Sequence, residues 1–142
     1  MGMFSKNSVA MLGTCHPDLQ RIFYEVVLFH DCTIIEGTRA IERQKQLFAS
    51  GKTKTMASKH INTPSLAVDA APFIYGRGIP WPDKKLAGNT YTKDLCQFYL
   101  FAGIVLDRAD SLGVKLRWGG DWDRDFDLAD QTFDDLVHFE LI

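Results

Sequence analysis

Residues 135–141 read DLVHFEL, and from Val137 to Leu141 apolar and polar side chains alternate. Successive side chains of a β-strand point to opposite faces of a sheet, so this alternation predicts a strand with one apolar and one polar face. His138 and Glu140 would share the polar face, and the apolar residues around them would face a core. We therefore expect the chain to end in a strand of a sheet whose two faces differ in chemistry.

The segments upstream predict helices and short strands that do not alternate as β-α-β units. Pro17 suits the first position of a helix, and Gly113 suits the residue that follows the end of one. We expect an α+β fold, a small and mainly antiparallel sheet with helices packed on one face. The expected helices span residues 17–30, 40–49 and 92–112, the expected strands span 32–37, 66–71, 114–118 and 136–141, and residues 51–65 form a polar loop.

The composition predicts one globular domain, residues 1–142, because 46% of the residues are hydrophobic and 24% are charged. A net charge of −2 provides no basic surface for a nucleic acid, and no apolar run approaches the roughly 20 residues of a membrane-spanning helix. The N-terminus lacks the features of a signal peptide, so we expect synthesis in the cytoplasm and no membrane anchor. Cys15, Cys32 and Cys96 are expected to be buried, reduced thiols.

Several polar residues occupy positions that suggest a metal site. Asp69 lies in the apolar run LAVDAAPF, where a carboxylate is costly unless a metal or cation balances it. The imidazoles of His60 and His138, together with this carboxylate, would suit Zn²⁺ with a fourth position left to water. Asp135 could then accept a proton from that water. Each residue also has a structural interpretation, as a hydrogen-bonded histidine, an ion-paired aspartate or a solvated acid, and spacing alone does not decide between them.

Three motifs follow one another along the chain. They are Ser58-Lys59-His60 followed by Ala67-Val68-Asp69, then Trp118-Gly119-Gly120-Asp121-Trp122, then residues 135–141. In this order they resemble the zinc peptidases of the D-alanyl-D-alanine carboxypeptidase and L-alanyl-D-glutamate endopeptidase group. More narrowly, the chain from about Glu36 onward is similar to the single-domain endolysins of tailed bacteriophages. The resemblance implies the zinc D,D-peptidase (hedgehog-like) fold.

The resemblance also implies roles for individual residues. His60, Asp69 and His138 would bind zinc, and Asp135, three residues before the last ligand, would be the catalytic acid/base. Arg39 matches an arginine that in relatives faces the scissile carbonyl or a substrate carboxylate. Without the resemblance, it would equally be a surface residue at the start of a helix.

Further residues would support this site. Ser58 would orient His60 or contact substrate, and Glu140 would hold a ligand or Arg39 rather than bind metal itself. Trp118, Asp121 and Trp122 would either line the cleft or, in the interpretation we prefer, form a structural turn packed by two indoles.

The chain departs from the family pattern in one place. Relatives place the first histidine seven residues before the aspartate with a glycine between them, whereas Asp69 follows His60 by nine residues. Residues 62–65 replace the glycine-containing turn. Two additional loop residues cost little closure entropy, so we expect a different turn and a retained site.

The resemblance implies a phage endolysin that uses Zn²⁺ to hydrolyse a stem-peptide bond of bacterial peptidoglycan, L-Ala–D-Glu. We expect a monomer that is made in the host cytoplasm and acts on the cell wall after release through the inner membrane. One alternative is a D,D-carboxypeptidase that removes terminal D-Ala, and another is a non-catalytic zinc-stabilised module that binds the wall or belongs to the virion. Asp135 favours an enzyme, because a closed structural zinc site has no use for a neighbouring acid/base.

Overall fold

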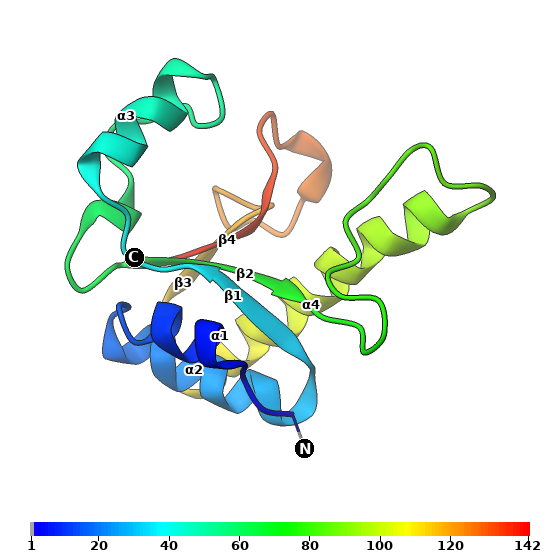
Figure 1. The fold of residues 1–142 in the computed structure, drawn as a ribbon, viewed down its shortest axis with the longest axis horizontal. Coiled ribbons are helices and arrows are strands. Elements are labelled where there is room, and N and C mark those ends of the chain that lie inside the picture. The colour runs from blue at the N-terminus through cyan, green and yellow to red at the C-terminus, as the bar shows by residue number, and fades with distance from the viewer. Residues whose placement is uncertain (1) are drawn as a thin grey trace.

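A four-stranded antiparallel sheet lies at the centre of the protein, in the order β1-β2-β4-β3 (Figure 1). The computed structural model describes residues 2–142. The predicted α+β class and antiparallel sheet are confirmed. The strands are β1 (Cys32–Glu36), β2 (Ala67–Pro72), β3 (Leu116–Gly119) and β4 (Asp135–Leu141); the α-helices are α1 (Lys6–Leu12), α2 (Pro17–Phe29), α3 (Ile41–Ala49) and α4 (Thr90–Ser111); the 3-10 helices are η1 (Lys59–Ile61) and η2 (Leu128–Asp130).

One face of the sheet is apolar and covered by helices. Helices α1, α2 and the C-terminal part of α4 lie on this side (Figure 1), where α1 contacts β1 and α4 contacts β2, β3 and β4. Phe139 of β4 is fully buried here, and its ring meets Phe23 of α2 and Phe101 of α4 edge-on at centroid distances of 5.7 and 6.0 Å. Burial of these large apolar side chains is the main force that fixes the helices to the sheet.

The other face of the sheet is polar. Helix α3 and the segment that leads into β4 extend on this side (Figure 1). Strand pairing brings polar residues opposite one another there, because Asp69 of β2 is in register with His138 of β4, and Arg117 of β3 with Glu140 of β4. The alternation of residues 137–141 therefore separates a core face from a face that carries chemistry.

The structure differs from the sequence-based expectation near the N-terminus. Helix α1, which was not predicted, begins at an N-cap formed by Ser5 and packs on β1, where Ser8 accepts a hydrogen bond of 3.0 Å from the backbone of Ile34. Seven residues are too few to show a clear helical period, so tertiary packing stabilises this helix. The expectation of three buried thiols is wrong for Cys96, which is exposed on α4. None of the helices in residues 2–142 has the length and apolarity to cross a membrane.

Candidate active site

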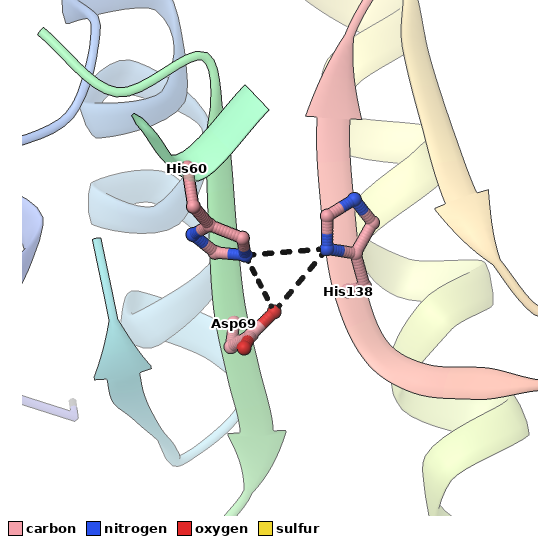
Figure 2. A group of neighbouring side chains, drawn as sticks. All are labelled: His60, Asp69 and His138. Carbon is pink, nitrogen blue, oxygen red and sulfur yellow. Dashed lines mark hydrogen bonds and ion pairs between the residues drawn. The ribbon is translucent and has the colours of Figure 1, made fainter. Parts of the chain in front are cut away.

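The three side chains that were predicted as zinc ligands converge on the polar face of the sheet (Figure 2). His60 comes from η1, Asp69 from β2 and His138 from β4. His60 Nε2 lies 3.1 Å from Asp69 Oδ1 and 3.3 Å from His138 Nδ1, and the last two atoms are 3.4 Å apart. Tetrahedral ligands at zinc–ligand distances of about 2.0–2.1 Å lie ~3.3 Å from one another. The spacing and the chemistry of the donors therefore fit a zinc ion.

The second nitrogen of each imidazole is held by an acceptor outside this group. His60 Nδ1 lies 2.7 Å from the carbonyl oxygen of Gly37, and His138 Nε2 lies 2.9 Å from Oε1 of Glu140. A carbonyl or carboxylate oxygen only accepts, so in the neutral rings these nitrogens carry the proton. The lone pairs of His60 Nε2 and His138 Nδ1 then point at the common centre, as in metal sites whose histidines donate their other N–H to an acceptor.

Electrostatics in this group favour a positive charge. Burial by itself would raise the pKa of Asp69, but the contacts of its carboxylate with His138 and His60 outweigh it and hold the pKa well below its usual range. Burial would lower the pKa of His138, yet Asp69 and Glu140 raise it to about 9. Burial would raise the pKa of Glu140, but the hydrogen bond to His138 lowers it to about 2. In the metal-free protein a proton on His138 balances the carboxylates, and a divalent cation can take its place.

Asp135, the predicted acid/base, begins β4 at the rim of this group. It pairs with Gly119 of β3, and any side chain at Gly119 would collide with the Asp135 carbonyl. Burial raises the pKa of Asp135 and the charge of Asp69 adds to this, while His138 lowers it in part. A carboxylate whose pKa is raised is suited to accept a proton and return it.

The side chain of Arg39 is only 9% exposed, so its interpretation as a surface residue is wrong. Its Nε and Nη2 donate to the two carboxylate oxygens of Glu36 at 2.8 and 2.9 Å, and its Nη1 donates to Gln44 at 2.7 Å. Nη2 also lies 3.6 Å from Asp69 Oδ2. The carboxylate that holds Arg39 is thus Glu36, and not Glu140, which instead contacts His138.

A bulge in β1 explains how Glu36 reaches this face. The pairing of β1 with β2 shifts between Ile34 and Glu36, so that Glu36 comes opposite Asp69. Without the shift, Glu36 would have the same orientation as Ile34, whose side chain is in the core. Bulges commonly redirect a side chain next to a functional site in this way.

Ser58 contacts the backbone of His60, Trp118 belongs to the core, and Trp122 lies beside His138. Ser58 caps η1, and its hydroxyl accepts a hydrogen bond of 3.2 Å from the backbone N–H of His60. Trp118 is buried in the core and donates from Nε1 to the Leu136 carbonyl at 2.8 Å. The Trp122 ring lies beside the His138 ring, with centroids 5.5 Å apart.

Asp121 is buried outside the histidine group. Its Oδ2 accepts a hydrogen bond of 3.1 Å from the backbone of Phe126, whereas its Oδ1 has no hydrogen-bond partner within residues 2–142. Asp121, Asp123 and Asp125 bring one oxygen each to within 4.8 Å of one another. This second acidic group contains no imidazole, and two of its three members are exposed.

Other residues that contact the site were missed from the sequence. Gln44 is fully buried and links Arg39 to the Thr55 carbonyl, to which its Nε2 donates at 2.6 Å. Lys59 and Arg117 both contact Oε2 of Glu140, at 3.3 and 3.1 Å. The contacts of Lys59 and Arg117 with Glu140 join segments that are distant in the sequence, so no local pattern indicates them.

Comparisons with known proteins show what this chain is similar to. Residues 1–142 match the family model described as phage L-alanyl-D-glutamate peptidase. The L-alanyl-D-glutamate peptidase of Escherichia phage T5 is 32% identical over 148 residues, which cover 98% of this chain and 97% of that protein. The crystal structure of the Serratia marcescens L-Ala D-Glu endopeptidase ChiX matches 99% of this chain and 91% of its own, with a TM-score of 0.72 and 24% identity, and so has the same fold.

Together, the fold and these matches define the protein as a peptidase. The chain belongs to the phage L-alanyl-D-glutamate peptidase family. The family and the peptidoglycan-endopeptidase class that the sequence motifs predicted are confirmed.

Proposed function

We propose that this protein is a zinc-dependent endopeptidase that hydrolyses the L-Ala–D-Glu bond of bacterial peptidoglycan and thereby lyses the host cell wall. The observation that carries the proposal is the triangle of His60 Nε2, Asp69 Oδ1 and His138 Nδ1, whose sides of 3.1 to 3.4 Å suit three ligands of one zinc ion. Membership of the L-alanyl-D-glutamate peptidase family supports the choice of bond.

In this proposal, the side chains divide the work of hydrolysis. His60, Asp69 and His138 hold the metal. When bound, zinc supplies Lewis-acid activation of the attacking water and of the scissile carbonyl. Asp135 takes the proton from the water and passes it to the leaving amine of D-Glu, and the raised pKa of its carboxyl makes the first transfer easier.

Arg39 stabilises the developing oxyanion or a substrate carboxylate. A guanidinium has five N–H donors, and Glu36 and Gln44 accept from three of those of Arg39 within the described residues. The two-pronged contact with Glu36 fixes the plane of the guanidinium, so the remaining donors are oriented before substrate arrives. Such preorganised donors stabilise a transition state without reorganising during the reaction.

The proposal is tested by digesting purified peptidoglycan with the zinc-loaded protein and identifying the products by mass spectrometry. We expect new N-terminal D-Glu, and no cleavage after zinc is removed with a chelator. Release of free D-Ala would instead identify a D,D-carboxypeptidase. Binding to peptidoglycan without cleavage, at full zinc content, would identify a non-catalytic module.

We also propose a domain organisation, an oligomeric state and a place of action for the protein. Residues 1–142 act as one catalytic domain and as a monomer, made in the host cytoplasm and active on the wall after release through the inner membrane. Light scattering of the purified protein, with an expected mass near 16.1 kDa, tests the oligomeric state.

A further inference from the structure

The imidazole of His138 is supported on two sides. At its edge, Nε2 lies 2.9 Å from Oε1 of Glu140. On its face, the Trp122 ring lies at a centroid distance of 5.5 Å with an interplanar angle of 33°. The first contact sets which nitrogen faces the metal group, and the second limits rotation of the ring.

Both supports are held by one side chain, that of Arg117. Arg117 is directly opposite Glu140 in the β3–β4 ladder, on the polar face. Its Nη2 and Nε lie 3.1 and 3.3 Å from Oε2 of Glu140, and its Nη1 donates to the backbone carbonyl of Trp122 at 3.4 Å. The guanidinium therefore links the group at the edge of His138 to the residue on its face.

Other contacts fix Trp122 to its own loop. Its backbone N–H donates to Oε1 of Gln131 at 2.9 Å, its Nε1 donates to the Phe133 carbonyl at 2.7 Å, and its ring stacks on that of Phe133. These contacts hold the indole within the segment before β4, and the carbonyl contact with Arg117 ties this segment to β3. Lys59 also neutralises Glu140, at 3.3 Å from Oε2, so the particular contribution of Arg117 is geometric.

We infer that Arg117 is a positioning residue that orients the His138 ring and thereby sets the affinity of the site for its metal. The inference rests on the proposed zinc site. An arginine is needed because its planar fork reaches two acceptors at once, whereas a lysine is a single point of charge. Loss of a residue that supports a metal-binding histidine typically weakens metal binding by about 10–100-fold.

The experiment measures zinc affinity by chelator competition in the wild type, Arg117→Met and Arg117→Lys. We expect Arg117→Met to bind zinc about 10–100-fold more weakly. Arg117→Lys should fall between Arg117→Met and the wild type, because it keeps the contact with Glu140 and loses that with Trp122. The visible absorption of the cobalt-loaded proteins, which reports ligand geometry, should change in the same order.

The matched control is Arg108→Met on α4. Arg108 pairs with Asp107, and its side chain is 34% exposed against 31% for Arg117. We expect this variant to bind zinc like the wild type. An equal loss of affinity in Arg108→Met would overturn the inference, because the effect would then be general destabilisation.

Two further outcomes separate the inference from the proposed function. Wild-type affinity in Arg117→Met, or in Arg117→Lys if the methionine variant does not fold, overturns the role of Arg117 but leaves the zinc site intact. Absence of zinc binding in the wild type overturns the proposed function and this inference with it.

Discussion

The two faces of the central sheet are built from the same strands and have different requirements. On the apolar face, Val68 and Phe139 are fully buried among helices. Asp69 and His138 are the sequence neighbours of these two residues, and they place their donor atoms 3.4 Å apart on the polar face. Hydrophobic burial is non-directional and tolerates small shifts, whereas ligand geometry does not. Stability and chemistry are therefore carried by alternate residues, and substitutions on the two faces should have separable effects.

The largest effects are expected on the polar face, and the first comes from Asp135→Ala. Loss of a general acid/base costs typically 10²–10⁴-fold in rate, so hydrolysis of peptidoglycan should fall by about that factor while zinc content is unchanged. Turbidity of a peptidoglycan suspension and metal analysis measure the two quantities. Hydrolysis at the wild-type rate would show that Asp135 is not the acid/base.

His60→Ala is the companion variant. It removes a ligand atom of the triangle, so zinc content and activity should be lost together. Retention of stoichiometric zinc in this variant would contradict the ligand assignment.

On the apolar face, Phe23→Ala should lower the free energy of unfolding by about 3–5 kcal/mol, because a fully buried aromatic ring leaves a cavity. Chemical denaturation measures this loss. Zinc affinity of the folded protein should stay within about twofold of the wild type. A loss of zinc affinity as large as in His60→Ala would show that the two faces are not independent.

The stability of the metal-free protein should depend on pH through two residues of the polar face, His138 and Glu140. The pKa of His138 is raised from 6.5 to about 9, so its stabilising charge is fully present below pH 6.5 and is lost as the pH rises through 9. The pKa of Glu140 is lowered from 4.5 to about 2, so its contribution is present above pH 4.5 and is lost as the pH falls toward 2.

Thermal unfolding across this range should therefore show maximal stability of the metal-free protein between pH 4.5 and 6.5. Zinc competes with protons for His138, so its affinity should instead rise with pH through this range and up to about 9. A metal-free protein as stable at pH 9 as at pH 6 would contradict the raised pKa of His138.

The smallest effect is expected from Asp123→Asn, in the second acidic group. Asp123 is exposed and lies outside the histidine triangle, so zinc affinity should stay within about twofold of the wild type. Chelator competition checks this value. A tenfold loss would show that the two groups are coupled.

Much of this organisation was predictable from local sequence. The alternation in residues 137–141 predicted the strand and its two faces, and the motif order predicted the family and suggested the candidate ligands His60, Asp69 and His138. The altered spacing between His60 and Asp69 left both donors within reach of one centre. Helix α1 was missed because its stability comes from packing on β1, which no local pattern records.

The sequence by itself determined which residues alternate, which segments are apolar and which side chains can bind a metal, because these are properties of neighbouring residues. Tertiary structure alone decided the partners: the bulge that sets Glu36 opposite Asp69, and the ladder that sets Arg117 opposite Glu140. Such contacts join segments far apart in the chain, and they form only when strand register is fixed by the packing of the whole sheet.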